Sequence, residues 1–294
     1  MNKCIKFEKK MQLISPYVKT YKKDFNSFIS LMDSIKKYNH DNIPLVVSVN
    51  DKDYNFFKRR IKGDFILIKD SDITKTSVTD KWRYQQIIKM QFFKLNFSKN
   101  YVCIDSDSIF IRDFYISDFI QNETPFLIKH KSSNFVSELA EFGFDTDELF
   151  FIKSLKATKK IFNNKDSDIF DYGPSPYIWN CSIWESFFNE YLKDTNIESF
   201  FKELDKLYLP SENTIYGEYL IHLKNTNYIA RNELFKVFHF KEQLNNETNK
   251  NIDFLSNKYK DDYLGIIIQS NFKFRNIFKI NYNNLKFLFF KYNY

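Results

Sequence analysis

Apolar and polar positions alternate regularly through the first hundred residues of the chain. Four short runs are apolar almost throughout, which is typical of strands buried on both faces of a parallel sheet. These runs are residues 12–18, 44–49, 64–69 and 101–104. Between them, apolar residues recur at helical spacing in residues 24–38, 54–60 and 79–95. Strands that alternate with helices predict an α/β, Rossmann-like fold whose mostly parallel sheet is flanked by helices.

The pattern is less regular after Asp113. Further apolar runs predict strands, and further periodic stretches predict helices. The strands are expected at 125–129, 177–180, 237–240 and 263–268, and the helices within 145–163, 197–207 and 213–223. Because no repeat or low-complexity linker interrupts the chain, we predict one domain over residues 1–242. A helical extension rich in basic and aromatic residues should follow over 243–294.

Polar segments follow three of the predicted strands. Pro16 and Tyr17 are expected in a loop that ends the first strand, and Asn50 opens the turn after the second. The fourth strand runs directly into Asp105–Asp107. Ligands of parallel sheets bind beyond the carboxyl ends of the strands, so these segments should converge on one crevice.

Asp105 and Asp107 are the strongest candidates for chemistry, with Ser106 between them. Two carboxylates at the end of an apolar strand suit Mg²⁺ or Mn²⁺, which keep waters and phosphate oxygens in their coordination shell. Such an ion would bridge a diphosphate and neutralise the charge of a leaving nucleotide. The alternative is a solvated turn without a ligand, but the apolar residues on both sides favour the metal site.

One face of the helix predicted at 79–95 carries groups suited to sugar hydroxyls and phosphate. Helical spacing brings four of its side chains together, and Arg83 lies beside them. The four are Trp82, Gln85, Gln86 and Lys89. The alternative is a solvated face that covers a neighbouring helix.

Two ionisable residues of the second half could also take part. Ser211 can cap a helix, which places Glu212 in its first turn, where a carboxylate could act as a base toward a sugar hydroxyl. Glu212 could equally do no more than complement the helix dipole. His239 lies between two phenylalanines at the end of a predicted strand. Its imidazole could bind Mn²⁺ or could simply pack in the core.

Composition and charge narrow the choice of ligand. The chain contains only 5 glycines among 294 residues, which argues against a glycine-rich phosphate loop and again favours a metal ion. The net charge of +7 suits anionic partners such as nucleotide sugars, acidic glycans or an anionic membrane face. No dense basic helix is present, so we do not expect nucleic acid as a partner.

The expected compartment is the cytoplasm. The cysteines Cys4, Cys103 and Cys181 are odd in number and far apart, as is common where thiols stay reduced. Residues 1–10 have no apolar signal-peptide core, and no apolar run is long enough to span a bilayer. Residues 263–294 lack Asp and Glu and interleave cations with bulky apolar residues. This mixture predicts peripheral binding to an anionic membrane face, unless the apolar residues pack on the domain.

The same residues, taken together, carry a resemblance to a known family. The chain resembles bacterial glycosyltransferases of the GT-A fold, and within them the DUF6492 family of capsule- and lipopolysaccharide-associated proteins. The similarity covers roughly residues 10–242. It rests on Pro16-Tyr17, Trp82 with Gln85-Gln86 and Lys89, Ile104–Asp107, Trp179-Asn180, Ser211-Glu212 with Tyr216-Gly217, and His239-Phe240.

This resemblance implies a metal-dependent glycosyltransferase of bacterial surface polysaccharide synthesis. The donor would be a nucleotide-diphosphate sugar, preferably a UDP-sugar, and the acceptor a glycan or lipid-linked glycan. Asp107 would bind Mn²⁺ or Mg²⁺ directly, Asp105 would hold the ribose or a metal-bound water, and His239 would be a further ligand. The C-terminal half would face the acceptor, through Trp179 and Asn180. Inverting members place a carboxylate at a helix start, which fits Glu212.

Two other interpretations stay open at this point. A phosphohydrolase of the haloacid dehalogenase type also has Asp-x-Asp after a strand, but needs an acidic pair after a later strand. Asp261-Asp262 instead precedes its strand. A non-catalytic, sugar-binding component of an envelope-glycan complex is the third interpretation, which the intact Asp105 and Asp107 disfavour.

Overall fold

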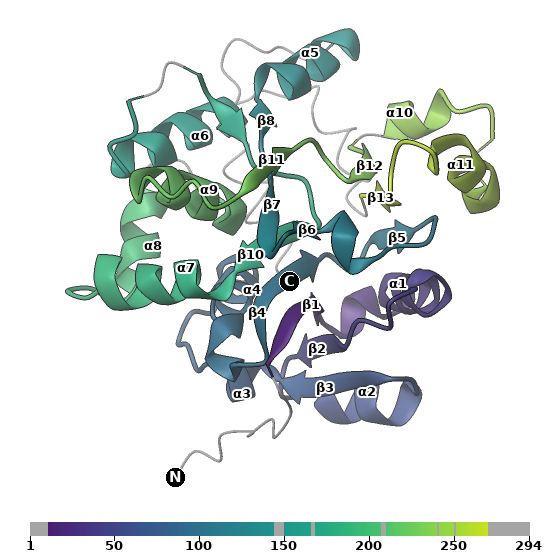
Figure 1. Cartoon of the computed structure of the whole chain (residues 1–294), viewed down its shortest axis with the longest axis horizontal. Helices are drawn as coiled ribbons and strands as arrows, with labels where there is room; N and C mark the ends of the chain where they lie inside the picture. Colours follow the sequence, from purple (N-terminus) through teal and green to yellow (C-terminus); the bar gives the residue numbers. More distant parts are fainter. Residues whose placement is uncertain are drawn as a thin grey trace.

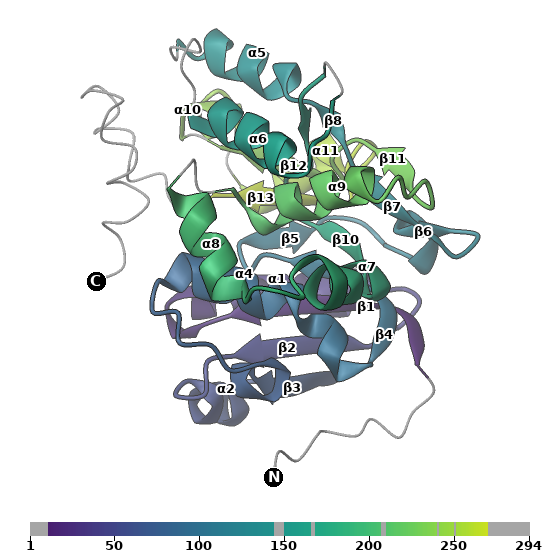
Figure 2. The same cartoon turned by 90° about the vertical axis from the view of Figure 1, so that its left-hand side faces the viewer.

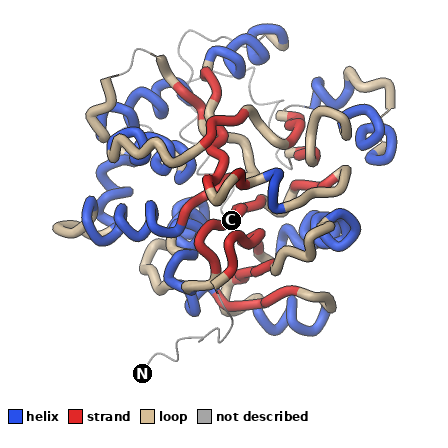
Figure 3. Tube along the Cα trace, in the orientation of Figure 1, coloured by secondary structure: helices blue, strands red, loops and turns tan. Residues whose placement is uncertain are grey.

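The protein has an α/β fold in which the strands run through the middle and the helices lie outside them (Figure 3). The computed structural model describes residues 11–143, 150–165, 168–206, 210–239, 241–249 and 251–269. The sheets are mixed, with both parallel and antiparallel pairs. The prediction of an α/β fold is therefore confirmed, while the parallel arrangement holds only for part of the strands.

The largest sheet has five strands in the order β10-β4-β1-β2-β3 (Figure 1). The first four strands of the chain are mutually parallel where they pair, and β10 is antiparallel to β4. Their bounds are Gln12–Thr20 (β1), Leu45–Val49 (β2), Phe65–Lys69 (β3), Ser98–Ile104 (β4) and Tyr177–Asn180 (β10). All five strands were predicted from their apolar runs.

The sheet separates two apolar layers, because successive side chains of a strand point to opposite faces. Tyr17 of β1 belongs to one layer and its neighbour Val18 to the other. The Val18 layer is covered by α1 (Phe25–Tyr38) and α2 (Tyr54–Arg60). The Tyr17 layer is covered by α4 (Lys81–Met90) and by helices of the second half.

The predicted loop at Pro16 and Tyr17 is wrong. Both residues lie inside β1, paired with Val102 and Cys103 of β4, and the strand continues to Thr20. Both side chains are buried, and the Tyr17 hydroxyl is 2.8 Å from the Ser48 Oγ. Apolar neighbours on both faces therefore override the tendency of proline to end a strand.

The second half adds small sheets and helices above the largest sheet (Figure 2). Three strands form the order β12-β13-β5, three more form β11-β7-β6, and β8 pairs with β9. Their bounds are Ser108–Phe110 (β5), Ile120–Gln121 (β6), Thr124–Ile128 (β7), His130–Lys131 (β8), Phe170–Asp171 (β9), Ile229–Arg231 (β11), Phe235–Phe238 (β12) and Gly265–Ile268 (β13). The remaining α-helices are Asp70–Ile73 (α3), Ser133–Glu141 (α5), Phe150–Ile161 (α6), Cys181–Ser186 (α7), Ile197–Asp205 (α8), Glu212–His222 (α9), Lys241–Asn245 (α10) and Ile252–Tyr259 (α11). Short 3₁₀ segments lie at Lys22–Asp24, Phe92–Leu95 and Ile116–Asp118, and a π-helical turn at Phe187–Tyr191.

Part of the predicted extension is joined to the rest of the fold. β13, at Gly265–Ile268, pairs with β12 and with β5, and Leu255 of α11 packs with Ile111. The segment expected at a membrane lies mostly beyond residue 269, outside the described residues. Within the described ranges, none of the helices combines the length and the apolar character needed to cross a bilayer.

Helix α9 lies between the largest sheet and α6 (Figure 2) and is buried over its first nine residues. At Gly217, the ring of Tyr172 lies close against the backbone of this helix. A Cβ added there would lie 2.1 Å from the Tyr172 ring, and the Tyr172 hydroxyl bonds the Glu218 carboxylate at 2.9 Å. Because Gly217 has no side chain, the Tyr172 ring in the segment that leads into β10 can pack directly against the α9 backbone.

Replacement of Gly217 with alanine should destabilise the protein by about 1–3 kcal/mol, the usual effect of overpacking a core. The added methyl group would displace Tyr172 from Glu218. A chemical denaturation series would measure the loss. Combining Gly217→Ala with Tyr172→Ala should cost less than the sum of the single changes. Strict additivity would show that the two residues do not meet.

Candidate active site

Asp105–Ser108 forms a tight turn between β4 and β5. The Ser108 N–H donates to the Asp105 carbonyl at 3.1 Å, which closes the turn. The Asp105 N–H donates to the Ser175 Oγ at 3.0 Å. The turn therefore stands at the carboxyl end of a central parallel strand, where ligands of such sheets bind. The strand-end position predicted for Asp105 and Asp107 is confirmed.

Lys89 joins this turn to the start of α9. Its Nζ lies 2.7 Å from Oδ1 of Asp105 and 3.2 Å from Oε1 of Glu212. The Lys89 side chain is only 4% exposed. Burial disfavours its charged form, but the two carboxylates more than offset burial and raise the pKa of Lys89 well above its ordinary value. A permanent cation therefore links α4, β4 and α9.

A second group of ionisable side chains faces Asp107 from the segment after β1. Burial, and then the charge of Asp105, raise the pKa of Asp107 to about 7. Burial also raises the pKa of Asp24, against hydrogen bonds from Tyr21 and Ser106. The charges of Asp24 and Asp105 act on Asp107 together. The turn thus carries negative charge that a bound cation would relieve.

The raised pKa of Asp107 predicts a specific pH dependence of stability. An unfolded Asp has a pKa of about 3.9, so between that pH and about 7 only the folded state keeps this proton. Asp107 therefore lowers the free energy of unfolding as pH rises through this window. Asp107→Asn should lose less stability than the wild type from pH 4 to pH 7. Urea titrations in EDTA would measure both, and parallel pH profiles would contradict the shift.

Arg83 and Gln86 form a buried hydrogen-bond network beside Pro210, just before Glu212. Arg83 is 3% exposed, and its Nε lies 2.9 Å from the Asp205 carboxylate. One guanidinium nitrogen donates to the Pro210 carbonyl at 2.5 Å and to the Gln86 Oε1 at 2.6 Å. Gln86 is fully buried. Arg83, supported by Gln86, therefore bonds the last residue of α8 and Pro210 just before α9.

The other members of the predicted α4 face are more accessible. Trp82 and Gln85 are half-buried, and the Trp82 ring stacks on the Arg83 guanidinium at 4.3 Å. The predicted polar face is not solvated along its whole length, because Gln86 and Lys89 are buried with Ile87 and Ile88. The Gln86 amide oxygen accepts from Arg83 of the same helix, and the Lys89 ammonium bonds Asp105 and Glu212.

Asn50 is found at the carboxyl end of β2, as predicted. Its carbonyl accepts from Asp53 at 2.8 Å, and its side chain accepts from the Lys52 N–H at 3.2 Å. Lys19, in the neighbouring strand, contacts the buried Asp70 at 3.1 Å. The strand ends beside Asp105 are thus polar, whereas Tyr17 lies below them in the core.

The segment from Asp171 to Ser175 completes the site and was not recognised in the sequence. Ser175 meets the Asp105 N–H, and a Cβ on Gly173 would lie 3.0 Å from the Asn213 Nδ2 of α9. Asp171 accepts from the Gly173 N–H at 3.0 Å. No local pattern marks these residues as partners of a distant turn, because β10 pairs with β4 only in the folded chain.

His239 lies among different neighbours from those of the two aspartates. Its ring packs against Phe135 at 4.8 Å, and the charges acting on it are those of Asp171 and Lys236. Burial lowers the pKa of His239 to about 4, so the imidazole is neutral near pH 7. The structure gives no support to His239 as a co-ligand of Asp105 and Asp107.

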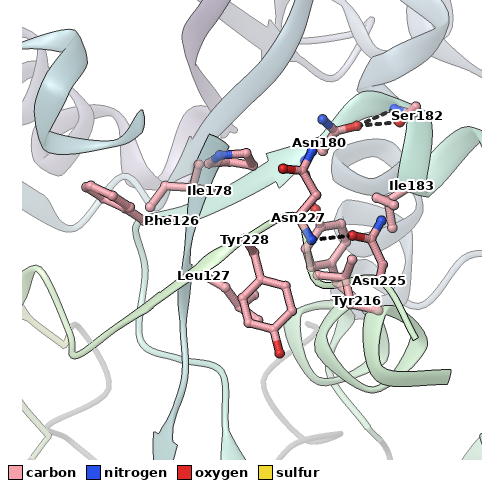
Figure 4. A pocket seen from close by; sticks show the side chains of 12 residues that line it. Phe126, Leu127, Ile178, Asn180, Ser182, Ile183, Tyr216, Asn225, Asn227 and Tyr228 are labelled. Atoms are coloured by element: carbon pink, nitrogen blue, oxygen red, sulfur yellow. Dashed lines mark hydrogen bonds between the residues drawn. The ribbon is translucent and has the colours of Figure 1, made fainter. Parts of the chain in front are cut away.

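Trp179 and Asn180 lie away from the Asp105 turn. Trp179 is 1% exposed in the core, and Asn180 pairs with Asn100 near the start of β4. Asn100 is five residues from Asp105, or about 16 Å at 3.3 Å per residue. Asn180 instead borders a cavity of about 60 Å³ with Asn225, Asn227 and Tyr228 (Figure 4). That volume holds a few waters and is too small for a sugar.

Within the described ranges, no group of three or more His, Cys, Asp or Glu side chains forms a ready metal cage. Mg²⁺ and Mn²⁺ bound with nucleotides need no such cage, because phosphate oxygens and waters supply most ligands. The unrelieved charge around Asp107 is compatible with that kind of ion.

Comparison with curated proteins finds no match for this chain. A family model described as "Family of unknown function (DUF6492)" matches residues 8–261. The match covers the largest sheet, the Asp105 turn, α9 and most of the described C-terminal elements. The chain therefore belongs to the DUF6492 family.

Proposed function

We propose that the protein is a metal-dependent glycosyltransferase with a GT-A-like nucleotide site. The observation that carries this proposal is the Asp105–Asp107 turn, in which two carboxylates end a central strand and the pKa of Asp107 is raised to about 7. The donor would be a nucleotide-diphosphate sugar, with UDP-sugars favoured. The acceptor would be a glycan or a lipid-linked glycan of a bacterial surface polysaccharide.

Asp107 and Asp105 would hold Mn²⁺ or Mg²⁺, which would neutralise the charge of the leaving diphosphate. Lys89 keeps Asp105 in place through its 2.7 Å contact. The nucleoside would lie across the polar strand ends near Asn50 and the exposed Tyr21. Trp82 and Gln85 could contact the donor only through their accessible parts.

Glu212 would be the base of an inverting reaction. It is the first residue of α9 and 5% exposed, so it is less accessible than the sequence suggested. Its Oε1 is bonded to Lys89, which leaves Oε2 to take the proton from an acceptor hydroxyl. The deprotonated acceptor oxygen would attack the anomeric carbon while the bond from that carbon to the diphosphate oxygen breaks.

Donor hydrolysis tests the activity without knowledge of the acceptor, because water can replace the acceptor hydroxyl. The purified full chain would be incubated with UDP- and GDP-sugars, with Mn²⁺ or with EDTA. We expect release of a nucleoside diphosphate from at least one donor with Mn²⁺ alone. Release of inorganic phosphate instead would indicate a phosphohydrolase, and no release would favour a sugar-binding component.

Glu212→Gln should retain donor binding and lose turnover by about 10²-fold or more, as expected when a general base is removed. The glutamine can still accept a hydrogen bond from Lys89. Glu218→Gln is the matched control, since Glu218 is equally buried on the same helix but bonds Asn164 and Tyr172. If both variants turn over donor at the wild-type rate, Glu212 is a structural residue.

A further inference from the structure

A basic groove lies at the C-terminal end of α6, separate from the Asp105 turn. Its volume is about 410 Å³, within the usual range of ligand sites. Four lysines and two amides dominate its lining, and we call it the α6 groove. They are Lys156, Lys159, Lys160, Lys165, Asn163 and Asn164.

The positive charge of the α6 groove is largely uncompensated. Lys159 donates to the Asp168 carbonyl at 2.5 Å, and the Asp168 carboxylate lies 3.1 Å from Lys131. Across the part of the chain that the structure describes, no carboxylate forms an ion pair with Lys156, Lys160 or Lys165. An anionic ligand could therefore pair with these three ammonium groups without displacing a carboxylate of the described residues.

Helix stability does not account for all of these lysines. Cations in the last turn complement the helix dipole, and Lys159 and Lys160 occupy that turn. Lys156 lies one turn earlier, and Lys165 follows the helix after Asn163, whose φ of 55° ends it. Their convergence on one groove needs a different explanation.

The α6 groove opens beside the helix that begins with Glu212. Asn164 donates to the Glu218 carbonyl at 2.9 Å and to its carboxylate at 2.5 Å. Glu218 is six residues after Glu212, which is about 9 Å along a helix at 1.5 Å per residue. A short saccharide bound in the groove could therefore extend to Glu212, the proposed base.

We propose that the α6 groove binds acidic saccharide units of the acceptor glycan. This inference rests on the proposed function. Lysines would pair with carboxylate or phosphate groups, and the Asn163 amide and the Asn164 amide oxygen would bond sugar hydroxyls. Interfacial membrane binding needs bulky apolar side chains beside the cations, whereas Ile169 is the one apolar residue of the described lining.

Calorimetry on the full chain, in EDTA and without nucleotide, tests this site apart from the donor site. The probes are a hyaluronan tetrasaccharide, a phosphorylated mannopentaose and the neutral chitotetraose. The groove variant is Lys156→Gln, Lys160→Gln and Lys165→Gln. A matched control changes three exposed lysines of the N-terminal half to Gln, namely Lys36, Lys62 and Lys75.

At least one acidic saccharide should bind at low salt, and chitotetraose should not. The groove variant should bind it roughly tenfold more weakly, as expected from losing three exposed ion pairs, while the control variant keeps wild-type affinity. Equal affinity in both variants, or no binding of either acidic probe, overturns the inference. So does a groove variant that loses binding to phosphatidylglycerol vesicles while its saccharide affinity is unchanged. Acidic saccharide binding without any donor hydrolysis would contradict the proposed function alone.

Discussion

Asp107→Asn is expected to abolish metal-dependent turnover of a nucleotide sugar, by about 10³-fold or more, the upper range for losing one group that stabilises a transition state electrostatically. Asparagine keeps the shape of the turn but cannot supply the negative charge that a divalent cation needs. Mn²⁺-dependent nucleotide binding should disappear as well. Nucleoside diphosphate release and a Mn²⁺ titration followed by electron paramagnetic resonance would measure the two effects.

Asp33→Asn provides the control, because Asp33 is an exposed carboxylate on α1. It should behave as wild type in both measurements. The Asp107 variant should also be at least as stable as wild type near pH 8, since it removes a carboxylate with a raised pKa. Inactivity can then be separated from misfolding. Wild-type turnover in Asp107→Asn would remove Asp107 from the proposed site.

Lys89→Met should destabilise the protein by about 3–5 kcal/mol, the usual cost of removing one partner of a buried ion pair. The change leaves Glu212 buried without its cation and frees Asp105 from the contact that fixes it. The free energy of unfolding from urea titrations measures the loss. Adding Glu212→Gln should recover part of it, because the unpaired charge is then gone.

The matched control for Lys89 is Lys206→Met. Lys206 pairs with Glu203 on α8, but these side chains are 61% and 69% exposed. An exposed pair contributes about 0–1 kcal/mol, so this variant should unfold almost as the wild type does. Similar losses in the two lysine variants would show that the Lys89 contacts with Asp105 and Glu212 do not stabilise the fold.

Much of the first half of the fold could be predicted because its signals are local. The apolar run before Asp105 and the helical spacing in α1 each reflect burial along one element. Short strands such as β8 and β9, of two residues each, carry no period that a sequence pattern could reveal. They are strands only because they pair with each other, His130 opposite Asp171 and Lys131 opposite Phe170, at positions far apart in the chain.

The residues of the candidate site also differ in how far the sequence could predict them. Asp105 and Asp107 follow a strong strand, so their position at the edge of the sheet could be predicted. The role of Lys89 could not, because its partner Glu212 is 123 residues away in the chain. Trp179 also shows the limit of motif reasoning, since an aromatic residue suited to sugars is buried in the core here.

The most direct test of the central hypothesis is calorimetric titration of the full chain with UDP and with GDP. Each titration is carried out with Mn²⁺ and again with EDTA. The proposed site predicts that at least one nucleotide binds with Mn²⁺ and that its binding is lost in EDTA. Equal binding in EDTA, or no binding of either nucleotide with Mn²⁺, would contradict a metal-dependent nucleotide-sugar site at Asp105 and Asp107.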